Sequence, residues 1–290
     1  MMIKLFYTLA FAVLIGGLAY HFAALKIFNF IVPKDATSYQ VGGLQSYGLD
    51  PDQTLNVFKP NVSNAGLPIL IFVHGGSWQE GDASDYGFVG RGFAAKGFLT
   101  FVINYRKHPE HPYPAFVQDV ATSLAWVQSN AEHYGGNNQN IFLVGHSAGA
   151  YDIALAVLDK RYLVEAGVNI STIKGVATLA GPFDFLPLDS NITQEVFGKI
   201  SDLESTQPIN YARKDAPPFL ILHGTADTTV YPKNAKSLYR HLLEAGAAAK
   251  LIEYQGVSHV GILLDMAKPL RKNAPVLEDV TDFFKDILKQ

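Results

Sequence analysis

The stretch Ile141-Phe-Leu-Val-Gly-His-Ser-Ala-Gly-Ala150 decides the fold of this chain. It predicts a short buried strand, a tight turn and a helix that begins near Ala148. Gly145 and Gly149 flank the serine, because a side chain at either position would collide with the neighbouring strand and helix. Ser147 is therefore expected at the tip of the turn, in a strained backbone conformation with its hydroxyl exposed. Such a turn, a nucleophile elbow, presents a serine for attack beside a helix N-terminus that stabilises negative charge.

The composition is that of one large globular domain. The 290 residues are 48% hydrophobic and 17% charged, without a break that would divide the chain. The net charge is −3 with no run of basic residues, so no nucleic-acid partner is expected. The absence of cysteine excludes disulfides, thiolate metal sites and a cysteine nucleophile. The prolines between His108 and Pro114 prevent a helix that would align the two histidines there, so no metal is predicted. No cofactor and no protein partner are predicted either.

The N-terminus, residues 1–32, is a separate segment. An apolar run from Leu5 to Ala19 follows Lys4, and a second, weaker apolar stretch extends to Val32. One interpretation is a cleaved signal peptide, for which Gly17-Leu-Ala19 is the nearest cleavage site. The favoured one is an uncleaved membrane anchor helix over about residues 3–24. Both interpretations place the domain outside the cytoplasmic membrane. It would be anchored to that membrane if the segment is uncleaved, and periplasmic or secreted if it is cleaved. A buried helix of a soluble domain is the third alternative.

Residues 33–290 are predicted to form an α/β domain. Residues 33–45 are interpreted as a linker, followed by an opening hairpin that turns at Asp50-Pro-Asp52. Apolar runs without alternation predict buried strands at 67–73, 98–103, 141–144, 173–179, 219–224 and 249–254. Helices are expected between them, and Asp119 on one of these is interpreted as a surface or capping charge. The pattern predicts a mostly parallel twisted sheet of about eight strands with helices on both faces.

Three residues have the order that nucleophilic catalysis by serine requires. A serine hydroxyl needs a base to take its proton, and the base needs a carboxylate to fix its tautomer. Ser147, Asp227 and His259 each follow a predicted strand, so they are expected at the carboxyl edge of the sheet, where sites form. Asp184 is the alternative acid. His223 is expected to pack.

A second glycine-rich turn, His74-Gly-Gly-Ser-Trp78, ends the strand at 67–73. Glycines after a buried strand leave main-chain N–H groups free to face a ligand. We therefore predict an oxyanion hole made by Gly75, Gly76 and Ala148. His146, beside the nucleophile, is expected to line the pocket or to bond locally.

Together these motifs resemble the α/β-hydrolase superfamily, and within it the carboxylesterase and lipase-like group with an HGG oxyanion loop. The resemblance covers about residues 45–290, and its neighbours in pattern include feruloyl-esterase-like proteins, isoprenylcysteine methylesterases and kynurenine formamidases. The stretches that match in order and spacing are His74–Trp78, Asn104–Arg106, Gly145–Ala150 and His223–Asp227 with Val230. Tyr151-Asp152 departs from the pattern, since several relatives carry histidine and then an apolar residue there.

The resemblance implies a serine carboxylesterase that hydrolyses short-to-medium acyl esters of small molecules through an acyl-enzyme. An amide or formamide hydrolase with the same triad is the alternative. A membrane-anchored binding protein without catalysis is a minor one, since a fold alone does not guarantee activity. Residues 185–212 are interpreted as a short cap insertion over the site.

Overall fold

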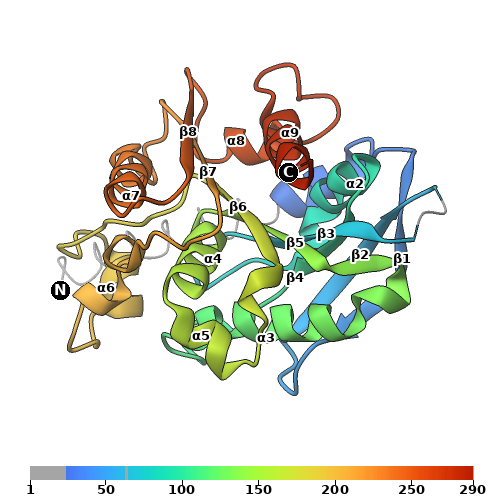
Figure 1. Cartoon of the computed structure of the whole chain (residues 1–290). Coiled ribbons are helices and arrows are strands. Elements are labelled where there is room, and N and C mark those ends of the chain that lie inside the picture. The colour runs from blue at the N-terminus through green and yellow to red at the C-terminus, as the bar shows by residue number, and fades with distance from the viewer. Residues whose placement is uncertain (1–23, 63–64, 290) are drawn as a thin grey trace, which may run out of the picture.

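A computed structural model describes residues 24–62 and 65–289, which form one eight-stranded sheet (Figure 1). The strand order is β1-β2-β4-β3-β5-β6-β7-β8. β1 and β2 pair antiparallel, as do β2 and β4, and the other neighbours are parallel. The strands are β1 (Ser38–Ser46), β2 (Thr54–Pro60), β3 (Leu67–Val73), β4 (Leu99–Ile103), β5 (Gly136–His146), β6 (Ile173–Leu179), β7 (Phe219–Gly224) and β8 (Ala249–Tyr254). The mostly parallel sheet is as predicted.

Helices cover both faces of this sheet (Figure 1). One face carries α3 (Ala115–Asn130), α4 (Ala148–Leu158) and α7 (Lys233–Glu244), whose buried residues share one hydrophobic cluster. The other face carries α2 (Gly87–Ala95) and α9 (Val276–Leu288), whose buried residues share a second cluster. Three helices are shorter: α5 (Lys160–Glu165), α6 (Asn191–Phe197) and α8 (Gly261–Leu264).

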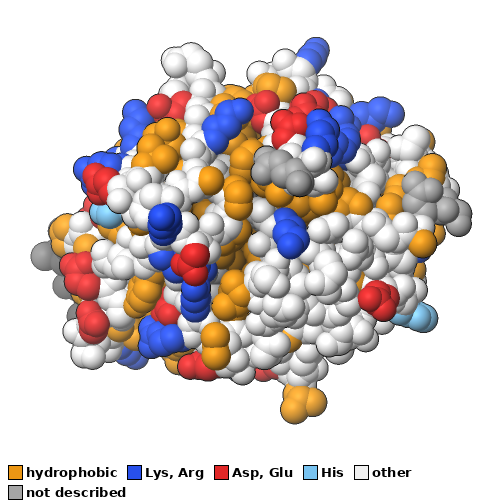
Figure 2. All heavy atoms as spheres, in the orientation of Figure 1, with side chains coloured by type: hydrophobic (Ala, Val, Ile, Leu, Met, Phe, Trp, Pro, Cys, Tyr) orange, Lys and Arg blue, Asp and Glu red, His pale blue; other side chains and the backbone are white. Residues whose placement is uncertain are grey.

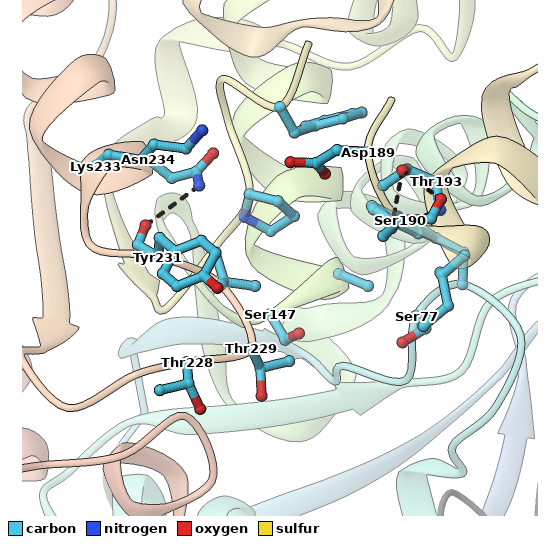
Figure 3. A pocket seen from close by; sticks show the side chains of 16 residues that line it. Ser77, Ser147, Asp189, Ser190, Thr193, Thr228, Thr229, Tyr231, Lys233 and Asn234 are labelled. Carbon is cyan, nitrogen blue, oxygen red and sulfur yellow. Dashed lines mark hydrogen bonds between the residues drawn. The ribbon is translucent and has the colours of Figure 1, made fainter. Parts of the chain in front are cut away.

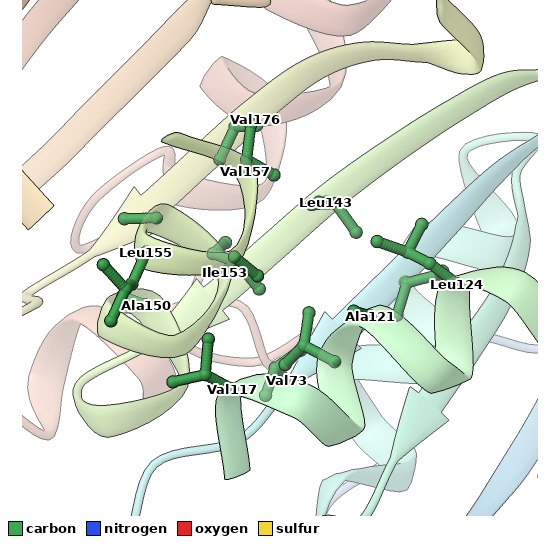
Figure 4. Packing of buried hydrophobic residues seen from close by; sticks show 14 of the residues in the cluster. Val73, Val117, Ala121, Leu124, Leu143, Ala150, Ile153, Leu155, Val157 and Val176 are labelled. Carbon is green, nitrogen blue, oxygen red and sulfur yellow. The ribbon is translucent and has the colours of Figure 1, made fainter. Parts of the chain in front are cut away.

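The central strand β3 shows why its apolar run does not alternate. Successive side chains of a strand point to opposite faces. Ile69, Ile71 and Val73 lie in the first cluster, against α3 and α4, while Leu70 and Phe72 lie in the second. Figure 4 shows the first of these contacts, where side chains of α3 and α4 meet those of the strands. Since both faces are covered, every position of this strand must be apolar.

The start of the domain differs from the predicted linker. Ser38–Ser46, which overlaps most of the expected linker 33–45, forms the edge strand β1. Most of its side chains face solvent, so it lacks the apolar pattern by which the other strands were predicted. The hairpin that turns near Asp50-Pro-Asp52 does exist, with its first strand earlier in the chain than expected.

Residues 24–31 form a helix that packs against the domain. The ring of Phe28 meets that of Phe88 edge to face at 5.3 Å, and the Asn29 side chain accepts the main-chain N–H of Phe88 at 3.1 Å. Among the helices of the described residues, none combines the length and apolar character needed to cross a membrane. The predicted anchor or signal peptide lies mainly in residues 1–23, outside the described residues, and stays a prediction.

Asp119 is not the surface or capping charge that was expected. It is fully buried in α3, where the guanidinium of Arg106 contacts its carboxylate at 2.7 Å. The main-chain N–H of Arg106 and the side chain of Gln53 each donate to it at 2.7 Å as well. The carboxylate thus joins α3 to the end of β4 and the start of β2, and its burial is possible because it is paired.

The surface carries charges of both signs. Basic and acidic side chains are interspersed on the face drawn in Figure 2, with hydrophobic side chains between them. Exposed pairs such as Lys236 with Glu253 at 3.2 Å contribute about 0–1 kcal/mol each. The stability of the fold therefore rests on the two hydrophobic clusters, not on surface ion pairs.

Candidate active site

The turn between β5 and α4 is the expected nucleophile elbow. Ser147 has φ 55° and ψ −122°, a conformation that non-glycine residues rarely adopt. A Cβ atom on Gly145 would lie 2.4 Å from the carbonyl oxygen of Gly149, and one on Gly149 would lie 2.3 Å from that of Val73. The main-chain N–H of Ser147 donates to Leu179 on the adjacent strand at 2.9 Å. Glycine is thus required at both positions, as predicted.

The structure brings the serine, histidine and aspartate of the prediction together. The hydroxyl of Ser147 lies 2.9 Å from Nε2 of His259, and Nδ1 of His259 lies 2.8 Å from Oδ2 of Asp227. Asp227 follows β7 and His259 follows β8, so the segments after β5, β7 and β8, at one edge of the sheet, supply the group. A proton can pass along this line from the hydroxyl to the imidazole.

The carboxylate of Asp227 is buried and held as an anion. Its Oδ1 accepts the main-chain N–H groups of Thr229 and Val230, each at 2.9 Å. Nε2 of His223 lies 3.2 Å from Oδ2 and 2.8 Å from the carbonyl oxygen of Val230, so it carries a proton that both oxygens share. Burial alone would raise the pKa of Asp227, but the hydrogen bonds from His223 and His259 outweigh it and lower the pKa well below its ordinary value.

The alternative acid and the neighbouring histidine have other partners. Asp184 accepts a hydrogen bond from the hydroxyl of Ser237 at 2.5 Å, so Asp227 and not Asp184 contacts the histidine. Nε2 of His146 donates to the carbonyl oxygen of His259 at 3.0 Å, so its hydrogen bond is to a loop far away in sequence and not the local one that was expected. Burial, and then the nearby His259, lower the pKa of His146 to about 3, so it stays neutral and supports the loop of the base.

Aromatic stacking and hydrogen bonds fix the loop that follows β3. His74 is fully buried and stacks between the rings of Tyr86 and Tyr105, at 5.3 Å and 4.7 Å. Its Nδ1 donates to the carbonyl oxygen of Gly75 at 2.7 Å, and the hydroxyl of Tyr105 donates to the carbonyl oxygen of His74 at 3.2 Å. Burial lowers the pKa of His74 to about 4, so it is uncharged. This gives the matched Asn104-Tyr-Arg106 motif a physical role: Tyr105 braces the loop, and Arg106 holds Asp119.

Glycine is also required in this loop. A Cβ atom on Gly75 would lie 2.8 Å from that of Ser147, and Gly76 has φ 140°. The loop backbone therefore lies directly against the nucleophile. Across residues 24–62 and 65–289, no acceptor in the chain is found for the main-chain N–H groups of Gly75, Gly76 or Ala148. Those groups are available to a bound oxyanion, and their use as an oxyanion hole is a proposal.

A cavity of about 370 Å³ opens above the nucleophile. Both apolar and polar side chains line it (Figure 3). Asp189, Ser190 and Thr193 stand on one side, and Tyr231 and Lys233 on the other, with the serine hydroxyl below. The lining residues are Ser77, Trp78, Ser147, Ala148, Pro182, Phe185, Asp189, Ser190, Ile192, Thr193, Thr228, Thr229, Val230, Tyr231, Lys233 and Asn234. The stretch predicted to be a cap thus supplies several of them.

Sequence reasoning missed one carboxylate near the site. Asp152 lies in α4, whose residues are all buried, and it accepts the indole N–H of Trp78 at 2.9 Å. The partner is in the glycine-rich loop, far away in sequence. The signal available was an acidic residue inside an otherwise uncharged helix that directly follows the nucleophile.

The sheet order, the elbow and the Ser-His-Asp group define a protein of the α/β-hydrolase class. A crystal structure of an inhibited esterase B from Lactobacillus rhamnosis is similar in fold, with a TM-score of 0.84 and 21% identity. The match covers 97% of each chain. This likeness confirms the predicted α/β-hydrolase fold.

Residues 55–242 match the family described as BD-FAE. This chain belongs to that family, which confirms the predicted esterase-like group. It is also 30% identical over 242 residues to esterase LipC of Mycobacterium tuberculosis, covering 77% of this chain and 60% of that protein. A probable isoprenylcysteine alpha-carbonyl methylesterase of Oryza sativa subsp. japonica is 30% identical over 256 residues, which cover 81% of this chain and 61% of that protein. The chain spans about three fifths of the length of these curated relatives.

Proposed function

We propose that the protein is a serine carboxylesterase that hydrolyses short-to-medium acyl esters of small molecules. The observation that carries the proposal is the unbroken line of contacts from Ser147 through His259 to Asp227 at the base of a cavity. Membership of the BD-FAE family and the similarity to curated esterases support it.

In this mechanism, the hydroxyl of Ser147 attacks the ester carbonyl while Nε2 of His259 takes its proton. Asp227, held as an anion, keeps Nδ1 of the imidazole protonated and stabilises the imidazolium that forms. The N–H groups of Gly75, Gly76 and Ala148 hold the negative oxygen of the tetrahedral intermediate. His259 then protonates the leaving alcohol, and water repeats the two steps on the acyl-enzyme.

The cavity supports a small acyl or alcohol group. Its volume of about 370 Å³ lies near the lower end of ligand pockets, which span about 300–1,000 Å³. Trp78, Phe185 and Ile192 offer apolar contact close to the nucleophile. We therefore expect hydrolysis to be faster for acetate-to-octanoate esters than for palmitate esters.

The test is hydrolysis of p-nitrophenyl esters from acetate to palmitate by the full chain. Ser147→Ala should lower turnover by about 10³-fold or more, because the remaining groups bind and polarise the ester but cannot attack it. Ser129→Ala is the matched control, because this serine is exposed on α3 and its hydroxyl bonds only to its own helix, so its turnover should equal that of the wild type.

Two other outcomes would redirect the proposal. Turnover of formamides or amides, without turnover of any ester, would retain the triad and replace the substrate class. A folded wild type that hydrolyses none of these and resists a fluorophosphonate would contradict catalysis and favour a binding protein.

We further propose export, with the domain anchored outside the cytoplasmic membrane or released by cleavage. The apolar run from Leu5 to Ala19 supports this. Membrane fractionation with mass measurement of the mature chain decides between the two forms, and intact protein in the cytosolic fraction would contradict both.

A further inference from the structure

The loop that carries two of the proposed oxyanion donors is strained. Gly76 has φ 140°, and the next two residues, Ser77 and Trp78, have φ 56° and 59°. Neither of these two is glycine, so each conformation costs free energy and persists only when the surroundings fix it. Something outside the loop must therefore hold it in place.

Trp78 is the residue through which the loop is held. Its side chain is only 3% exposed, and its ring meets those of Tyr151 and Phe197 edge to face at 5.1 Å and 4.9 Å. Its indole N–H donates to Oδ1 of Asp152 at 2.9 Å. Its carbonyl oxygen accepts the main-chain N–H of His108 at 2.8 Å. Of these contacts, the one with Asp152 is directional and comes from the elbow helix itself.

Asp152 is an unusual residue for its place. It is fully buried, and within the described residues its second oxygen, Oδ2, has no hydrogen-bond partner. Burial raises the pKa of Asp152 well above its ordinary value, and the hydrogen bond from Trp78 only partly offsets this, so burial favours the neutral acid. A leucine of similar size would fit this apolar helix without the cost of an unpaired polar atom. Asp152 costs stability at this position, and the hydrogen bond that its Oδ1 accepts from Trp78 explains why it is there.

We propose that Asp152 is a positioning residue, which ties the oxyanion loop to the elbow helix through Trp78. It lies on the same helix as Ala148, and Trp78 lies two residues beyond Gly76, so one hydrogen bond sets the two sources of oxyanion N–H groups relative to each other and to Ser147. This inference rests on the proposed esterase function and deepens it.

The contact makes a specific prediction about which variants are slow. Asp152→Leu removes the acceptor and frees the indole, so the loop can leave its strained conformation. Trp78→Phe keeps an aromatic ring, removes the donor and leaves a smaller side chain in the packed site. Each should lower kcat by at least about tenfold, since loss of one oxyanion donor outright costs about 10²–10³ in kcat. For Asp152→Leu, whose side chain is not among those that line the cavity, KM should stay within about threefold. Asp152→Asn retains a carbonyl oxygen for the indole and should keep kcat within about threefold of the wild type.

The double variant Asp152→Leu/Trp78→Phe separates positioning from simple stabilisation. If the two residues act through one contact, its kcat should match that of the slower single variant instead of the product of both effects. Because it no longer leaves the carboxyl group of Asp152 without its donor, it should unfold at a higher urea concentration than Trp78→Phe alone. A variant that regains stability without regaining kcat is the result that a merely structural role does not produce.

The assay uses the full chain, with rates normalised to the number of sites that a fluorophosphonate titrates. The affinity for a trifluoromethyl ketone, whose adduct has an oxyanion, should fall in parallel with kcat. Tyr254→Phe is the control, because it removes a largely buried hydrogen bond to Asp279 on β8 and α9, away from the cavity. The Tyr254→Phe variant should be less stable in urea and keep the wild-type kcat per active site titrated.

The outcomes distinguish this inference from the function on which it rests. A wild type without esterase activity would overturn the proposed function and the positioning role with it. An active wild type whose Asp152→Leu variant keeps its kcat and its ketone affinity within twofold would overturn the positioning role alone. Additive losses in the double variant would overturn it too, because the two residues would then act separately.

Discussion

The replacement Asp227→Asn tests how the acid controls the base. Oδ1 accepts two main-chain N–H groups, from Thr229 and Val230, so the oxygen of the new amide must take this position. The NH2 group then lies where Oδ2 was, facing Nδ1 of His259 at about the present 2.8 Å. Because an NH2 group can only donate, Nδ1 becomes the acceptor and the proton of the imidazole moves to Nε2. The histidine can then no longer accept the proton of Ser147.

The cost of this wrong tautomer follows from the chemistry of serine triads. We expect kcat to fall by about 10³–10⁴-fold, or about 4–5.5 kcal/mol of activation free energy. KM should change little, because the side chain does not line the cavity. The assay is steady-state hydrolysis of the best p-nitrophenyl ester, with unfolding in urea to show that the variant is folded.

Asp184→Asn is the matched control, because Asp184 was the alternative acid and bonds to Ser237 instead of the histidine. It should keep kcat within about twofold of the wild type. The reasoning would be refuted by an Asp227→Asn enzyme within tenfold of the wild type, or by an equal loss in the control.

Three further predictions concern packing, a buried ion pair and the pH dependence of stability. Gly149→Ala forces a Cβ to within 2.3 Å of the β3 backbone and should cost about 1–3 kcal/mol in urea unfolding, whereas Gly43→Ala, with open space around it, should change less than about 0.5 kcal/mol. Asp119→Ala leaves the guanidinium of Arg106 unpaired and should cost about 3 kcal/mol by the same measurement, while Glu253→Ala at an exposed pair should leave the midpoint unchanged. The pKa of Asp152 is raised in the native state, so the native state keeps a proton that the unfolded chain releases above about pH 4. The free energy of unfolding of the wild type therefore falls as the pH rises from there toward the native pKa, by up to about 1.4 kcal/mol per pH unit. Asp152→Asn lacks this slope, so its stability relative to the wild type should increase between pH 5 and pH 8, and a constant difference would contradict a neutral acid.

The central strands and the elbow could be predicted because their constraints are local. A strand covered on both faces must be apolar throughout, as in Leu67–Val73, and the elbow needs glycine at both ends of a tight turn. Serine, aspartate and histidine each follow a parallel strand, β5, β7 and β8, and this brought the three side chains to one edge of the sheet. The direction of the parallel strands fixes that edge, so the three residues could be grouped without knowledge of side-chain geometry.

The features that were missed depend on partners far away in sequence. β1 is an edge strand whose side chains are mostly exposed and which contains a glycine pair, so its residues carry no apolar pattern and were interpreted as a linker. Asp119 is buried because Arg106, which follows β4, and Gln53, which precedes β2, converge on it, and helix periodicity does not show this. Asp152 has its partner in Trp78, which only the packed structure brings near.

The measurement that tests the account most directly is the site of fluorophosphonate labelling in the full chain. Peptide mass spectrometry should find a single adduct, on the peptide that contains Ser147, and no adduct in Ser147→Ala. His259→Ala should label far more slowly, because no base would take the proton of the serine. An adduct on another residue, or none on folded wild-type protein, would contradict the claim that Ser147 is an activated nucleophile.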